Sequence, residues 1–193
     1  MKITFGFFVI LFFSFRVGAT SLALIPVEEL FKEADTVVIV EVVSGQILEN
    51  SCGAKYKARI VHNFKGIDSE FLHFGHYYGY EIGGRYLLFL TNPDRWYTRL
   101  STTNSTAEAA VEEFHKKCDE VLDINRVMHT GAGALEITKS TNEVVVQTEY
   151  IVFPESVPSR SSEFDKYGAV SKYVRIREKL VIEYLESIAN GRN

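Results

Sequence analysis

Hydrophobic positions in the first half of the chain follow the periods of β-strands. Residues 36–43 (TVVIVEVV) are β-branched and almost uninterrupted, which predicts a strand buried on both faces or in the wall of a barrel. Residues 55–64 alternate strictly between apolar and polar side chains, which predicts a half-buried strand. Its polar face carries Lys55, Lys57, Arg59, Val61 and Asn63. Residues 70–74, 85–90 and 95–100 predict three further short strands.

Helical spacing appears at the start of this region and again after it. Residues 26–34 predict a short amphipathic helix that begins with proline. Residues 106–122 carry apolar side chains on one helical face. A hairpin is expected over 134–153, a linker over 154–162 and a closing helix over 171–188. Five short strands before the second helix predict a mainly β protein with helices, a small Greek-key barrel or sandwich.

Three phrases in a fixed order resemble a known family. They are Glu29-Leu30-Phe31 with Ala34-Asp35-Thr36-Val37-Val38, then Phe64-Lys65-Gly66, then the run from Gly83 to Leu90 (GGRYLLFL). This order resembles the bacterial branch of the netrin-like family, OB-fold barrels related to tissue inhibitors of metalloproteinases. The resemblance covers residues 27–122. It implies an OB-like barrel with a trailing helix over 24–122. The hairpin and the closing helix that the pattern predicts then form an extension over 123–193.

The resemblance does not extend to the inhibitory residue of that family. Members that inhibit proteases begin at a cysteine whose free amine and carbonyl chelate the protease zinc. Here no cysteine precedes Cys52. Protease inhibition is therefore not carried over, and a degenerate inhibitor-like protein is kept only as an alternative.

The first 23 residues predict an export signal. Lys2 precedes an apolar run over residues 3–15, and small residues then offer cleavage after Ala19 or Ala23. The rival interpretation is a membrane anchor, but the run ends at Arg16 and is shorter than the roughly 20 residues that a spanning helix needs. We therefore expect a periplasmic or secreted protein without a membrane span after cleavage.

Composition and charge narrow the possible partners. Of the 193 residues, 46% are hydrophobic and 24% charged, the balance of a packed globular protein. Cleavage would remove two basic residues and no acidic ones, which leaves 19 basic against 25 acidic side chains, a net charge of −6. An acidic chain without a basic run is a poor candidate for binding nucleic acid. The expected partner is another protein or an envelope component.

Two cysteines, Cys52 and Cys118, remain after the signal. An even number in an exported chain favours a disulfide between them. Two buried thiols, or two thiols too far apart to pair, are the alternatives.

Metal-binding residues are sparse, and no catalytic motif or cofactor site is apparent. His73 and His76 lie three apart on a strand end, where they face opposite sides. His115 and Cys118 share a helical face and could join Cys52 around a metal, but a disulfide would use both sulfurs. The sequence therefore favours a non-enzymatic module without cofactor or metal, with a metal-dependent hydrolase as the alternative.

Aromatic residues form the most suggestive surface. Tyr77, Tyr78 and Tyr80 lie in a glycine-rich loop, and Trp96 and Tyr97 follow on the next strand. Tyr and Trp are enriched at recognition surfaces, so these five residues are the hypothetical binding site of the module. The alternative is that the rings cover the end of the barrel.

Overall fold

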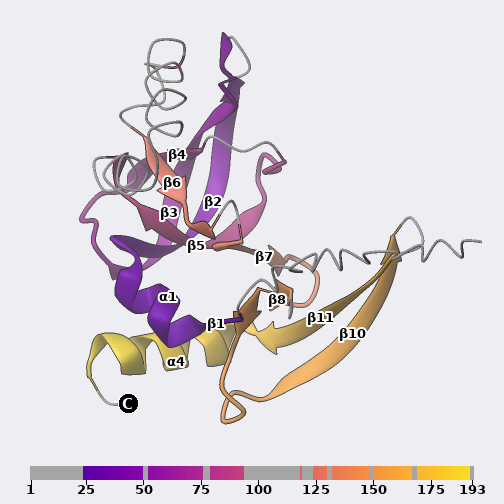
Figure 1. The fold of residues 1–193 in the computed structure, drawn as a ribbon. Coiled ribbons are helices and arrows are strands. Elements are labelled where there is room, and N and C mark those ends of the chain that lie inside the picture. Colours follow the sequence, from indigo (N-terminus) through magenta and orange to yellow (C-terminus); the bar gives the residue numbers. More distant parts are fainter. Residues whose placement is uncertain are drawn as a thin grey trace, which may run out of the picture.

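The computed structural model describes residues 24–49, 52–75, 79–93, 118, 124–129, 132–147, 150–166 and 169–191. Five strands in it close into a barrel (Figure 1). In the order in which they pair around the barrel, they are β2 (Thr36–Ile47), β3 (Ala54–Lys65), β4 (Phe71–Gly75), β6 (Asn125–Val127) and β5 (Arg85–Thr91). The β4–β6 pair is parallel and the other pairs are antiparallel. The fold is therefore a small, mainly β, OB-like barrel with helices, as the sequence predicts.

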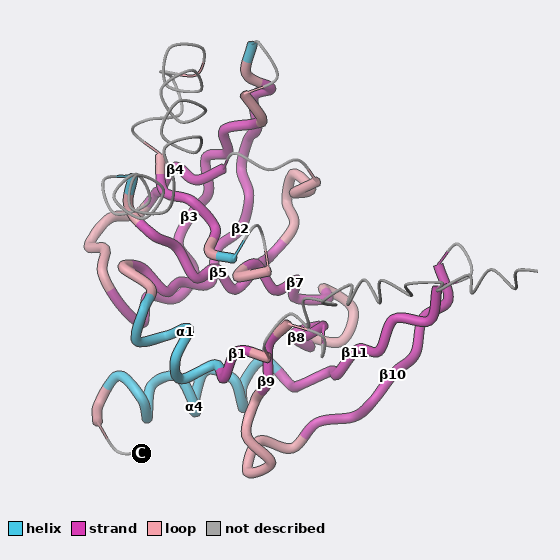
Figure 2. Tube along the Cα trace, viewed as in Figure 1, coloured by secondary structure: helices cyan, strands magenta, loops and turns pink. Residues whose placement is uncertain are grey.

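The sheet continues beyond the barrel through the C-terminal third of the chain. From β5 the strand order runs outward through β7 (Ala134–Thr138), β8 (Glu143–Gln147), β11 (Ala169–Arg177) and β10 (Ser159–Lys166). The last two form a long curved ribbon that leads away from the barrel (Figures 1 and 2). A separate parallel pair joins β1 (Ile25–Pro26) to β9 (Ile151–Val152). Residues 123–193 thus contribute one barrel strand and extend the same sheet.

Two helices lie side by side beneath the barrel (Figure 1). They are α1 (Val27–Glu33) and α4 (Glu178–Ala189), and the Tyr184 hydroxyl donates a hydrogen bond to the Glu28 carboxylate between them. Burial of the hydroxyl raises the pKa of Tyr184, and the adjacent Glu28 carboxylate raises it further. The phenol therefore stays protonated and remains a donor to Glu28.

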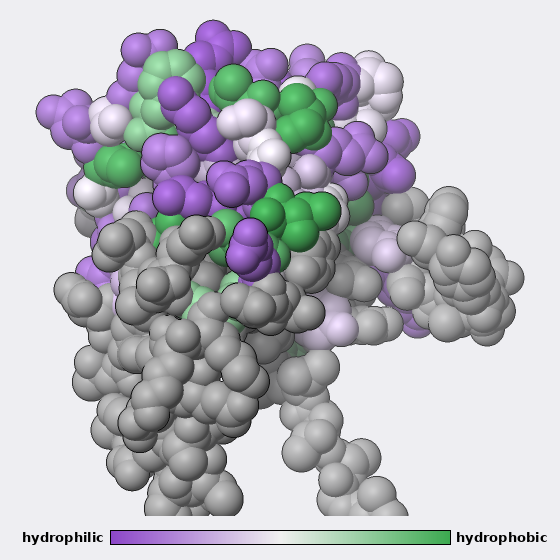
Figure 3. Space-filling view, turned by 90° about the horizontal axis from the view of Figure 1, so that it is seen from above, coloured by the Kyte–Doolittle hydropathy of each residue, from purple (hydrophilic) through white to green (hydrophobic). Residues whose placement is uncertain are grey.

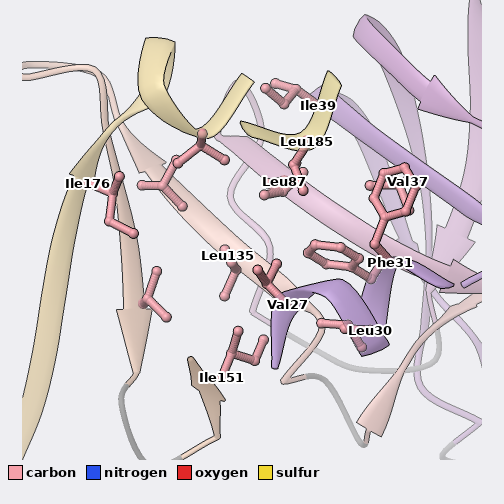
Figure 4. Close-up of a cluster of buried hydrophobic side chains, with 14 of the residues drawn as sticks. Val27, Leu30, Phe31, Val37, Ile39, Leu87, Leu135, Ile151, Ile176 and Leu185 are labelled. Carbon is pink, nitrogen blue, oxygen red and sulfur yellow. The ribbon is translucent and has the colours of Figure 1, made fainter. Parts of the chain in front are cut away.

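The first half of β2, residues 36–42, and strand β5 are buried on both faces and separate two hydrophobic cores. Val38, Val40 and Val42 of β2 point into the barrel with Leu88 and Leu90 of β5. The intervening side chains point outward and pack under α1 and α4 (Figure 4). They include Val37, Ile39, Leu87 and Phe89. This double burial explains why both segments are nearly continuous hydrophobic runs, and it confirms the prediction of strands buried on both faces.

The Phe64-Lys65-Gly66 turn ties the end of β3 to the end of α1. The Lys65 ammonium donates hydrogen bonds to the carbonyl oxygens of Phe31, Lys32 and Ala34 at 3.0, 3.0 and 2.5 Å. Gly66 has a φ of +94°, and a Cβ at this position would lie 2.0 Å from the Asp35 carbonyl oxygen. Both residues therefore have structural roles, because the last carbonyls of a helix need donors and only glycine fits this approach.

Two sequence predictions for the C-terminal region are wrong. Residues 159–162 belong to β10 instead of a linker, and residues 171–177 belong to β11 instead of the closing helix, which begins at Glu178. The apolar side chains of Val174, Val181 and Leu185 match a helical period, but β11 pairs with both β8 and β10, and this tertiary pairing overrides the local pattern. The export signal expected over 1–23 and the strand expected over 95–100 lie outside the described residues, and so does the helix expected over 106–122 except for Cys118.

The two cysteines form a disulfide, which confirms the favoured prediction. Cys52 and Cys118 are bonded across a sequence separation of 66, with 5.4 Å between their Cα atoms. Both are buried with Leu48 and Ile124 in a small cluster of their own. In the described part of the chain, no helix combines the length and the apolar character that crossing a membrane requires.

Candidate binding surfaces

The aromatic loop contributes one described side chain, Tyr80, and this ring closes the end of the barrel. It meets the rings of Tyr56, Phe74 and Tyr86 edge-on, with centroid separations of 5.1, 5.0 and 5.2 Å. Edge-to-face contacts of this kind are typical of packed aromatic clusters. Tyr80 therefore has a packing role in the structure.

The hydroxyl of Tyr86 anchors the same loop. It accepts a hydrogen bond of 3.0 Å from the backbone N–H of Glu81. Burial raises the pKa of Tyr86, although that hydrogen bond opposes the rise. The other predicted binding residues, Tyr77, Tyr78, Trp96 and Tyr97, lie outside the described residues, and a binding role for them stays a prediction.

On the face seen from above, the apolar side chains of described residues occur in separate patches among hydrophilic ones (Figure 3). The most exposed large ones are Ile47 at 75% and Ile82 at 62%. Such isolated exposure is normal for soluble proteins and does not by itself mark a site.

The outer face of β3 and β4 is the most distinctive charged surface. Three cations of β3 occupy alternate outward positions, Lys55, Lys57 and Arg59. Their cross-strand neighbours on β4 are Gly75, His73 and Phe71, and their neighbours on β2 are Gln46, Ser44 and Glu41. Because directly paired residues of adjacent strands share a face, these nine positions form one surface, which we name the basic face.

Specific contacts hold two of the three cations in place. The Lys57 ammonium lies 4.4 Å from the centroid of the Phe71 ring, a cation–π contact. The Arg59 guanidinium pairs with the Glu41 carboxylate at 2.6 Å, and both side chains remain substantially exposed. The basic face therefore holds three permanent cations and one carboxylate.

His73 adds a titratable group to this surface. Desolvation lowers its pKa, and the charges of Lys55 and Lys57 lower it further. Its backbone carbonyl accepts a hydrogen bond of 3.1 Å from the Asn125 side chain, which fixes β4 against β6. His73 is therefore neutral at pH 7 and becomes a fourth cation only in more acidic solution.

The metal sites considered from the sequence have little support. His76 and His115 lie outside the described residues, and the disulfide uses the sulfurs of Cys52 and Cys118. Among the described side chains, no group of three or more His, Cys, Asp or Glu is arranged to hold a metal ion.

An open cleft of about 710 Å³ separates β3 and the β7–β8 turn from the start of α4. Ion pairs line it. Arg85 and Glu178 form a two-pronged pair at 2.5 and 3.1 Å, and Arg160 binds Glu143 at 2.8 Å. Burial favours the neutral form of Glu143, but hydrogen bonds from Thr141 and Arg160 outweigh it and lower the pKa of this carboxyl. Because these charges neutralise one another, the cleft is a structural junction between α4 and the sheet.

Sequence reasoning placed Lys55, Lys57 and Arg59 on a solvent-exposed face but did not recognise a site there. The missing information was the pairing register, since β4 is what brings Phe71 and His73 beside these cations. A comparison with family models finds no match for this chain, and a comparison with curated proteins finds none either.

Proposed function

We propose that this protein is an exported, non-enzymatic binding module that binds an anionic ligand on its basic face. The observation that carries the proposal is the row of three outward cations on β3. The full chain has a formal net charge of −4, so this concentration of positive charge is local and contrasts with the rest of the molecule.

The barrel itself favours an external site. Its interior is filled by the side chains of one core, which include Tyr56, Phe74 and Leu88. A ligand must therefore contact an outer surface or a rim. OB-fold barrels bind ligands on the face of their second and third strands, and β3 and β4 occupy these two places in the barrel order.

Two features support export. The pattern of residues 1–23 is that of a cleavable signal, with a basic residue, an apolar run and small residues in order. The Cys52–Cys118 disulfide suits an oxidising compartment. The netrin-like resemblance, which no comparison tests, is compatible with this assignment but adds nothing to the identity of the ligand. Neither the hydrolase nor the inhibitor-like alternative has a specific observation in its favour.

Retention on an immobilised polyanion tests the proposal. The chain that begins at Leu24 would be applied to dextran sulfate and eluted with increasing salt, beside the double variant Lys55→Glu/Lys57→Glu. The matched control is Lys139→Glu/Lys179→Glu, which changes two exposed lysines away from the basic face by the same total charge. We expect the first variant to elute at clearly lower salt than the control. Equal elution of the two variants would show that binding follows net charge alone, and the proposal would be wrong.

A further inference from the structure

The three cations of the basic face are arranged in a line. Alternate residues of a strand lie on one side at intervals of about 6.8 Å, so Lys55, Lys57 and Arg59 span roughly 14 Å along β3. Phe71 holds the Lys57 ammonium and Glu41 holds the Arg59 guanidinium. Because these groups are held apart, they do not converge on a single small anion. The arrangement fits a ligand that carries several negative charges in sequence.

The same face presents two separate rings, Phe71 and His73, instead of a row of stacking platforms. The Lys57 ammonium already lies over the Phe71 ring, which leaves the single imidazole of His73. Proteins that hold single-stranded nucleic acid combine positive charge with aromatic platforms on which successive bases stack. The basic face has the charge but only one small ring that is not already covered by a cation, which disfavours a ligand that is recognised through successive flat rings.

An extended peptide has the matching period. Its alternate side chains also lie on one side at about 6.8 Å, so carboxylates at every second position would meet the three cations one to one. Ser44 and Gln46 are exposed beside Lys57 and Lys55, where they can donate hydrogen bonds to the same carboxylates. At the other end, the ion pair with Glu41 uses one guanidinium nitrogen of Arg59, Nη2, and a guanidinium carries five N–H donors, so Arg59 can bind a ligand carboxylate as well.

We propose that the ligand of the basic face is an extended acidic segment of a partner protein, with carboxylates at alternate positions along Lys55, Lys57 and Arg59. This inference rests on the proposed function, because it specifies the class of anion that the same face binds. Charge complementarity and the shared strand period are the observations that carry it.

Two labelled heptapeptides of identical composition test the inference. One alternates three aspartates with four serines, and the other has the three aspartates in a contiguous block. Fluorescence anisotropy with the chain from Leu24, at low ionic strength, would measure both affinities. We expect the alternating peptide to bind about fivefold more tightly, the modest preference that aligned but exposed ion pairs produce. In the variant Lys57→Met the ratio of the two affinities should fall towards one, and in the control Lys139→Met this ratio should be unchanged.

Two further probes separate this inference from the proposed function. They are an oligodeoxythymidine and polygalacturonate, measured by competition against the labelled alternating peptide. Equal affinity for the two peptides, or tighter binding of either competitor, would overturn the acidic-segment ligand and leave an anion-binding face. If no anion binds more weakly to Lys55→Glu/Lys57→Glu than to the control, the proposed function fails as well. If Lys57→Met does not fold, the comparison of the two peptides on the unmodified chain still decides whether the ligand is an acidic segment with alternating carboxylates.

Discussion

The lysine at the end of β3 offers a quantitative test of how the helices are held to the barrel. Lys65 donates to three carbonyl oxygens at the C-terminal end of α1, where no residue in the left-handed conformation caps the helix. We consider the change Lys65→Met, which keeps an unbranched apolar stem of similar length and removes the ammonium group.

The expected loss follows from these contacts. A hydrogen bond with a charged partner contributes about 1.5–3 kcal/mol net, and a cation in the last turn of a helix adds about 0.3–1 kcal/mol. The three bonds share one ammonium group, and water replaces part of them in the variant, so the sum is well below three full contributions. We expect Lys65→Met to lower the free energy of unfolding by about 2 kcal/mol. For a chain of this size, this corresponds to a fall in Tm of about 5 °C.

Urea denaturation followed by circular dichroism measures this loss, and Lys57→Met is the matched control. Lys57 lies on the same strand, but its ammonium contacts the Phe71 ring instead of helix carbonyls. An exposed cation–π contact contributes about 0.5–1 kcal/mol, so the control should lose clearly less than Lys65→Met. Equal losses in the two variants, with equal m-values, would refute the capping role of Lys65.

Three further predictions concern other parts of the fold. The change Gly66→Ala places a Cβ 2.0 Å from the Asp35 carbonyl oxygen at a φ of +94°. It should therefore destabilise the fold more than the control Gly79→Ala, which also has a positive φ but whose Cβ would have nothing within 4 Å. Comparable Tm values for the two variants would contradict this reasoning. Replacing both cysteines by serine opens a loop closed across 66 positions, and the chain-entropy model predicts a loss of about 4 kcal/mol in the free energy of unfolding. Urea denaturation of the variant and the oxidised parent measures this loss. A change below about 1 kcal/mol would argue against that model here. Because the lowered pKa of His73 makes the folded state resist protonation, its contribution to stability is present above the unfolded pKa of about 6.5 and is lost as pH falls below it. His73→Asn should therefore lose less stability than the parent between neutral and acidic pH, and identical pH profiles would exclude this linkage.

The local sequence pattern predicted the structure correctly where the hydrophobic side chains of a segment decide how it is buried. The runs that became β2 and β5 are hydrophobic on both faces because each separates two cores, and this appears directly as a lack of alternation. The short helix α1 and the β7–β8 hairpin were likewise predicted, the latter with its second strand too long.

Local pattern failed where long-range pairing decides the structure. Tyr173, Val174 and Ile176 became strand residues because β8 and β10 flank them, and no window of neighbouring residues contains that information. The same limit applies to the candidate sites. Tyr80 has the amphipathic character of a recognition residue, and its packing role appears only once Tyr56 and Tyr86 lie against it.

The order of strands in the barrel also constrains when the chain can fold as it emerges from a ribosome. The barrel closes through β6, which pairs with β4 and β5 only after a long intervening stretch of chain has appeared. The outer faces of β2 and β5 are covered by α1 alone until β7, β8 and α4 follow. In an emerging N-terminal portion, Val37, Ile39, Leu87 and Phe89 have only α1 to pack against, and this incomplete cover makes partial chains prone to aggregation and good substrates for chaperones. Late completion of this kind delays burial of the whole core until the C-terminal helix α4 has been synthesised.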